Sequence, residues 1–154
     1  MGAFIFPTIK EFDMNKKFWT GFVVVFVLME IMMFLIHGMI LSSAYQATQA
    51  LWRPDMMSLM WIYHVLAIIG AFFFTLVFSK GYEGKGVMEG VRYGLYIGIW
   101  MSAGMAYGSY AMINIPYSLA LQWFLYGMIE YIVYGVALAM VYGKQATVTP
   151  AAKA

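Results

Sequence analysis

The sequence predicts an all-α integral membrane protein: a bundle of four transmembrane helices with both termini in the cytoplasm. Of its 154 residues, 64% are hydrophobic and 10% are charged, whereas soluble globular chains have roughly 45–50% and about 25%. The apolar residues gather in four long segments, and most basic residues lie in every second connection. A soluble fold of this composition would have too few charged residues to cover its apolar surface. We therefore expect the chain to be surrounded by lipid.

Each apolar segment is long enough to cross a bilayer. A helix needs about 20 residues to span roughly 30 Å of hydrocarbon, and helices are expected because lipid offers the backbone no hydrogen-bond partners. The predicted spans are about 18–45, 57–78, 91–113 and 118–142. The first is longer than necessary and is expected to tilt or protrude. It is also too long for a signal-peptide core, and Glu30 and His37 interrupt it, so we expect it to be retained.

The positions of lysine and arginine predict the orientation. Eight of these nine residues precede the first span, lie near the second connection or follow the fourth span, and Arg53 is the exception. Cytoplasmic loops are enriched in basic residues, so both termini and the middle loop are predicted to be cytoplasmic. Lys80, Lys85 and Arg92 in and beside that loop are expected either to contact anionic lipid headgroups or simply to solvate a tight turn.

The two ends of the chain differ from the spans. Residues 1–17 mix aromatic and charged side chains, with Pro7 near the start, and we expect a short helix lying on the cytoplasmic membrane surface. Residues 144–154 are polar and contain Pro150. We expect this tail to be disordered. The predicted transmembrane domain is therefore 18–143.

The loops carry a recognisable pattern. The middle loop reads GYEGKG at 81–86 and is followed by EGVRYG at 89–94, while the first loop contains LWRP at 51–54. These motifs resemble those of a group of small bacterial four-helix membrane proteins, over roughly the middle half of the chain. The resemblance implies the four-span topology and a bacterial cytoplasmic membrane. It implies no activity.

Four glutamate or histidine residues fall inside the predicted spans: Glu30 and His37 in the first, His64 in the second and Glu130 in the fourth. A charged residue at mid-membrane costs roughly 2.5–3.5 kcal/mol on insertion scales, so such residues usually face the protein interior. Both glutamates fall near mid-span, and both histidines lie at a similar depth further outside. We therefore expect the histidines to face each other above a layer containing both carboxylates.

Helical spacing predicts which neighbours these residues have. Phe26, Glu30, Phe34 and His37 follow one stripe of the first span. Tyr126, Glu130 and Tyr134 follow a stripe of the fourth. Tyrosine hydroxyls beside a carboxylate can hydrogen-bond it in either protonation state.

Three interpretations of these residues remain open. They form a neutral, hydrogen-bonded lock between helices, or they relay protons or ions through the carboxylates. Alternatively, His37 and His64 hold haem b or a metal ion. Against that last interpretation, the chain has only two histidines and no Glu-x-x-His pair. The methionines of the first two spans suit copper(I) but also serve as ordinary packing.

The third span carries two stripes of small residues, which let helices approach closely. The first is Gly94, Gly98, Ser102 and Ala106, and the second is Gly104 and Gly108. One stripe is expected to pack inside the bundle. The other is expected to contact a second subunit or lipid.

No motif specifies a reaction, so an enzyme is not expected. No basic run suggests nucleic acid, and the absence of cysteine excludes disulfides and thiolate metal sites. We expect a non-catalytic membrane subunit that packs into a homo-oligomer or a larger membrane complex through its small-residue faces. The alternatives are a small proton or cation transporter or channel that uses Glu30 and Glu130, and an electron-transfer subunit that binds haem or metal.

Overall fold

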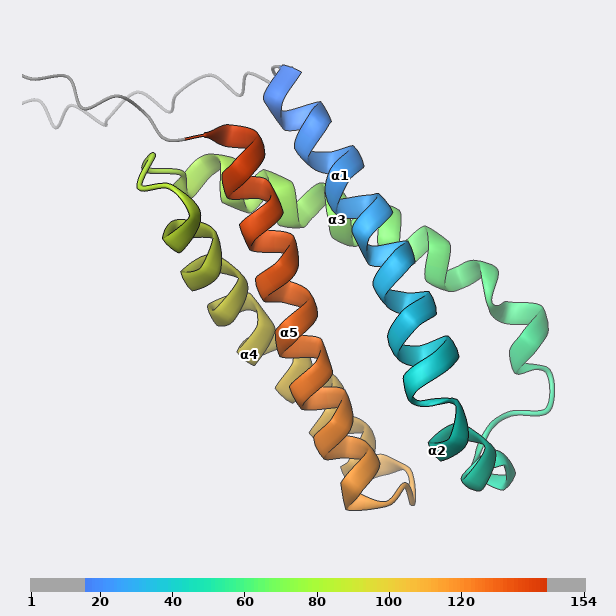
Figure 1. Cartoon of the computed structure of the whole chain (residues 1–154). Coiled ribbons are helices and arrows are strands. Elements are labelled where there is room, and N and C mark those ends of the chain that lie inside the picture. Colours follow the sequence, from blue (N-terminus) through green and yellow to red (C-terminus); the bar gives the residue numbers. More distant parts are fainter. Residues whose placement is uncertain (1–15, 144–154) are drawn as a thin grey trace, which may run out of the picture.

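The computed structural model describes residues 16–143, which are helical apart from short turns (Figure 1). Four long helical segments follow one another: α1 (Lys16–Met32) with its continuation η1 (Met33–Ile40), then α3 (Trp61–Gly81), α4 (Val87–Met112) and α5 (Tyr117–Tyr142). Three short elements link η1 to α3, namely α2 (Ser42–Ala47), η2 (Gln49–Leu51) and η3 (Met56–Leu59). The surface helix expected over 1–17 lies almost wholly outside the described residues, and the tail 144–154 lies entirely outside them.

Three segments within 16–143 are long and apolar enough to cross a membrane: Lys16–Ile40, Met56–Gly81 and Tyr117–Tyr142. The predicted all-helical class is confirmed, and these segments fit a membrane protein. Helix α4 is as long as α5 but is less apolar. The difference arises because α4 contains Glu89, Arg92 and more glycines than α5.

The long helices pack in an ordered series. Helices α4 and α5 form an antiparallel hairpin, and α1 packs against both α5 and α3 (Figure 1). Where α1, α3 and α5 meet, a buried cluster forms from Val25, Ala71, Phe74, Phe78, Tyr134, Leu138, Ala139 and Tyr142. This cluster holds the helices together over one half of their length.

The start of α3 leaves this cluster. Phe74 and Phe78 in its second half are buried, whereas Trp61 and Leu66 in its first half are exposed. Figure 1 shows the start of α3 on the far side of α1 from α5. The divergence of α3 from α5 makes room for the cleft described below.

A second buried cluster lies toward the other end of the molecule. It joins η1 and the following Leu41 to the α4–α5 turn, and its members are Ile36, Leu41, Ala106, Ile115, Leu119, Ala120 and Trp123. Tyr45 and Trp52 pack against it from the connection after η1. This cluster fixes η1 against α5 where His37 lies.

The first and last described helices end side by side. The Lys17 Nζ donates a hydrogen bond of 2.7 Å to the carbonyl of Tyr142, which satisfies a free carbonyl at the C-terminus of α5. The ring of Tyr142 in turn lies 5.1 Å from that of Tyr82, between centroids. The start of α1, the α3–α4 loop and the end of α5 therefore share one end of the molecule.

The α3–α4 loop is held in a fixed shape. Gly84 and Gly86 have φ angles of 77° and 82°, a region that favours glycine because other residues meet a Cβ clash there. The buried carboxylate of Glu89 accepts hydrogen bonds from the backbone N–H groups of Glu83 and Lys85. The loop is therefore tied to the first turn of α4.

Candidate functional site

Glu30 and His64 form a hydrogen-bonded pair between α1 and α3. The His64 Nδ1 lies 2.7 Å from Oε2 of Glu30. The side chain of Glu30 is 30% exposed and that of His64 is 62% exposed. The pair therefore lies on the accessible wall of a cleft and not within packed core.

Glu130 lies near the middle of α5 and is more buried, with 16% of its side chain exposed. Its Oε2 is 3.5 Å from the Tyr134 hydroxyl, which donates to it. Its Oε1 is buried, has no hydrogen-bond partner among the described residues and lies 3.9 Å from Nε2 of His37. The carboxylate is thus incompletely paired in an apolar setting, which is costly for its charged form.

His37 connects Glu130 to two aromatic residues. Its Nδ1 lies 2.5 Å from the hydroxyl oxygen of Tyr45, which also accepts a 2.8 Å hydrogen bond from Nε1 of Trp123. Because the indole only donates, the Tyr45 proton is free to point at His37 Nδ1. That assignment places the imidazole proton on Nε2, directed toward Glu130.

The direction of the His37 side chain depends on η1, which is a π-helix over Met33–Ile40. A π-helix has more residues per turn than an α-helix, and such segments are frequent at functional sites. Residues seven apart therefore no longer stack on one face. Phe34 is 65% exposed, and His37 turns toward α5 and Tyr45, away from the stripe that contains Glu30.

The structure therefore arranges the four polar residues differently from the sequence prediction. The histidines were expected to face each other above both carboxylates, but each contacts a carboxylate from another helix: His64 contacts Glu30, and His37 approaches Glu130. Of the two tyrosines expected beside Glu130, Tyr134 lies within reach. Tyr126 instead packs against the second buried cluster.

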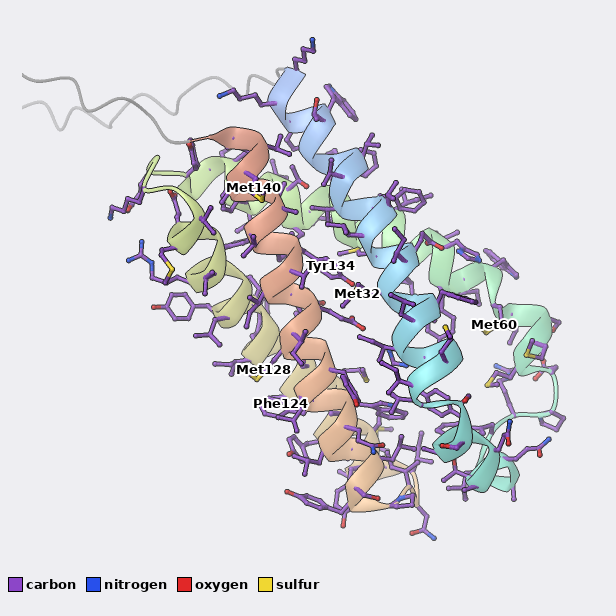
Figure 2. The ribbon with its side chains drawn as sticks, viewed as in Figure 1. Met32, Met60, Phe124, Met128, Tyr134 and Met140 are labelled. Carbon is purple, nitrogen blue, oxygen red and sulfur yellow. The ribbon has the colours of Figure 1, made fainter. Side chains whose placement is uncertain are left out.

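A cleft of about 220 Å³ brings three of these residues together. Its polar lining consists of Glu30, Tyr63, His64, Glu130, Tyr131 and Tyr134. Its apolar lining consists of Met29, Met33, Met60, Leu66 and Ala67. Figure 2 shows Tyr134 between α5 and α1, and Met60 near the start of α3. The cleft thus lies where α3 diverges from α5, and Glu30 and Glu130 both line it.

The described residues contain no group of three or more histidine, aspartate or glutamate side chains arranged to hold a metal ion. His37 and His64 have separate partners, Tyr45 and Glu30. This arrangement provides no support for the metal or haem interpretation.

The first small-residue stripe of α4 packs against α5. A Cβ on Gly94 would collide with the backbone of Tyr131 and Ile132. A Cβ on Gly98 would lie 3.3 Å from the Cα of Met128, and a Cβ on Gly127 would collide with the Ser102 side chain. Ala106 is buried further along. Gly104 and Gly108 face away, with nothing within 4 Å of a Cβ built on either.

The basic residues of the α3–α4 region lie exposed at the end of the molecule that holds Lys17 and Tyr142. Lys80, Lys85 and Arg92 are all exposed. Lys85 pairs with Glu83, and this hydrogen bond holds the pKa of the Glu83 carboxyl below its ordinary value. Contact of these residues with lipid headgroups stays a prediction.

Sequence reasoning missed Tyr45 and Trp123. Trp123 lies seven residues before Glu130, two turns along the same face of α5, and that spacing was available as a signal. Tyr45 follows a break in the helix at Leu41, so spacing along one helix does not predict its contact with His37.

Comparison with known proteins adds no assignment: no family model, curated protein or solved structure matches the chain.

Proposed function

We propose that the protein is a four-span membrane protein with both ends in the cytoplasm. Helix α4 supplies the fourth span, because its 20 residues Tyr93–Met112 carry no charge and are long enough to cross about 30 Å of hydrocarbon. Glu89 and Arg92 then lie at the membrane surface. The close antiparallel packing of α4 on α5, a span by its own composition, supports this assignment.

The distribution of charge supports the cytoplasmic orientation. The end of the molecule formed by Lys17, the α3–α4 loop and Tyr142 carries most of the described basic residues, whereas the opposite end carries Arg53, which pairs with Asp55 at 2.6 Å. A basic end faces the cytoplasm. A bacterial cytoplasmic membrane, implied by the loop resemblance, is part of the same proposal.

Within this topology, the best-supported activity is proton binding and transfer through Glu130. The observation that carries this proposal is the position of His37, whose two ring nitrogens face Tyr45 on one side and Glu130 on the other. Intramembrane glutamates and histidines in such chains serve as proton relays.

A single transfer passes one proton along Tyr45, His37 and Glu130. The Tyr45 hydroxyl gives its proton to Nδ1 of His37 while it receives one from outside, and Nε2 gives its proton to the Glu130 carboxylate. One proton has then moved inward, Glu130 is neutral, and His37 carries its proton on Nδ1. The chain is ready for the next transfer once the imidazole proton has returned to Nε2 and Glu130 has released its proton on the cytoplasmic side.

Proton flux into proteoliposomes tests this proposal. We expect pH-gradient-driven flux with the parent protein and at least a tenfold loss with Glu130→Gln, which keeps the size of the side chain and removes its titration. Glu83→Gln, in the exposed α3–α4 loop, serves as the matched control and should conduct like the parent. Absence of flux from the parent, or parental flux in Glu130→Gln, would contradict the proposal.

A second candidate function is assembly with another membrane subunit, or with a second copy, through α4. The outward face at Gly104 and Gly108 favours it, because nothing in the described chain fills the space beside them. The other stripe of α4, which begins at Gly94, does not favour assembly, because α5 already covers that face of α4. Crosslinking in membranes tests it: a dimer lost in the Gly104→Leu, Gly108→Leu double variant supports assembly, and an unchanged monomer opposes it.

A further inference from the structure

We propose that the cleft between α1, α3 and α5 binds a small organic cation, which exchanges with the proton held by its carboxylates. This inference rests on the proposed proton function and adds a substrate class to it. The cleft opens at mid-span, where α3 diverges from α5, and it contains Glu30 and Glu130 from different helices. No lysine or arginine lines it.

The charge of the cleft favours a positive ligand. Glu30 is paired with His64, which balances its charge only when the imidazole is protonated. Glu130 faces His37 at 3.9 Å and has a buried, unpaired oxygen. A buried carboxylate in an apolar wall needs either a proton or a counter-charge. The ligand that supplies the counter-charge is a cation.

The rest of the lining favours an organic cation over a metal ion. Tyr63, Tyr131 and Tyr134 line the cleft, and aromatic side chains attract ammonium groups, quaternary ammonium above all. Met29, Met33 and Met60 add soft, adaptable apolar surface. An inorganic cation would instead need several oxygen ligands, and the described residues contain no group of three or more histidine, aspartate or glutamate side chains placed to hold one.

The size of the cleft limits the ligand. A volume of about 220 Å³ falls below the roughly 300–1,000 Å³ of sites for drug-sized molecules. A trimethylammonium or similarly small alkylammonium group suits it better than a large aromatic cation does.

Binding is coupled to proton release in this arrangement. When the cation enters, the Glu130 carboxyl gives up its proton to solvent, and the resulting carboxylate pairs with the cation, so one proton leaves for each cation bound. The titratable groups around Glu130 are His37 from η1, Glu30 from α1, His64 and Tyr63 from α3, and Tyr131 and Tyr134 from α5. Tyr45, beside His37, completes the set. None of them is a fixed positive charge, so the cation has no permanent competitor.

The test compares choline with its neutral carbon isostere, in which carbon replaces nitrogen, on the purified full-length protein in mild detergent. Calorimetry measures binding, and a pH dye in weak buffer measures proton release. We expect choline to bind with proton release and the isostere to bind at least tenfold more weakly. Equal binding of both, or of neither, would overturn the proposal.

Variants locate the site. Glu130→Gln should weaken choline binding at least tenfold and abolish proton release, while Glu83→Gln should behave like the parent. Tyr63 is half-exposed, so its substitution should not disturb the fold: Tyr63→Phe keeps the ring and the affinity, whereas Tyr63→Leu weakens binding about two- to fivefold. Parental affinity in both Glu130→Gln and Tyr63→Leu would place binding elsewhere and contradict the site.

The proton-transfer function and the cation site can be contradicted independently of each other. Proton flux in proteoliposomes without choline binding contradicts the cation site and leaves the proton function in place. Choline binding at Glu130 without proton flux contradicts the proton-transfer function and leaves a cation-binding site.

Discussion

His37 approaches Glu130 across the contact between η1 and α5, with its Nε2 at 3.9 Å from the Oε1 of the carboxylate. The opposite ring nitrogen lies 2.5 Å from the Tyr45 hydroxyl. The imidazole therefore lies between an acid near the middle of α5 and an aromatic residue beyond the end of η1. The proposed proton transfer depends on this one side chain.

Removing the Tyr45 hydroxyl should disturb His37 without unfolding the protein. In Tyr45→Phe, Trp123 Nε1 loses its acceptor and His37 Nδ1 loses its partner, which costs about 1–3 kcal/mol of stability for the unpaired buried donor. We expect slower proton flux and a larger Nδ1–H tautomer population, measured by nitrogen NMR of labelled histidine. Tyr126→Phe, which changes a tyrosine outside this chain of contacts, is the control, and equal spectra for the two variants would argue against the relay.

The α4–α5 hairpin should tolerate no side chain at Gly94. A Cβ there lies 2.6 Å from the Cα of Ile132, and overpacking of this kind costs about 1–3 kcal/mol. Gly94→Ala should therefore lower the thermal unfolding midpoint in detergent. Gly104→Ala, on the open face, should raise stability by about 0.5–1 kcal/mol because alanine is the better helix former. If Gly104→Ala lowered stability and Gly94→Ala raised it, α4 would have to pack on α5 through the face that carries Gly104.

Glu89 should hold the α3–α4 loop closed. Its carboxylate accepts two backbone hydrogen bonds, and hydrogen bonds to a charged group contribute about 1.5–3 kcal/mol each. Glu89→Ala should accelerate hydrogen exchange of the Glu83 and Lys85 amides and increase cleavage by trypsin after Lys85. Unchanged hydrogen exchange at both amides would show that Gly84 and Gly86 determine the loop conformation without Glu89.

Membrane topology can be determined by labelling single introduced cysteines, because the sequence contains no cysteine of its own. Lys85→Cys, in the α3–α4 loop, should react with a membrane-impermeant maleimide only after permeabilisation of the cells. Asp55→Cys, in the connection before α3, should react in intact cells because it lies on the opposite side. Labelling of both in intact cells, or of neither, would refute the predicted arrangement.

The helical class and the three long apolar segments Lys16–Ile40, Met56–Gly81 and Tyr117–Tyr142 could be predicted from sequence, because both follow from composition and segment length. The packing role of Gly94 and Gly98 was also accessible, since four-residue spacing of small residues directly encodes close helix approach. The exposed position of Gly104 and Gly108 is consistent with either of the roles considered for them.

The pairing of the polar residues was not accessible from sequence. It depends on how each helix rotates about its axis, and the π-helix at Met33–Ile40 changes that rotation within the first span. Its residues are nearly all apolar and give no signal for the extra width of the helix. The contacts of His37 with Tyr45 and of His64 with Glu30 cross between elements, so no single-helix pattern predicts them.

The most direct measurement is infrared difference spectroscopy of the reconstituted protein during a step in pH. A protonated carboxyl absorbs at a distinct carbonyl frequency, so proton exchange at Glu130 gives a difference band that disappears in Glu130→Gln and persists in Glu83→Gln. We predict that band, together with histidine ring bands that disappear in His37→Gln. A carboxyl difference band that survives in Glu130→Gln, or the absence of any such band in the parent, would contradict the role of Glu130 as the proton-carrying group.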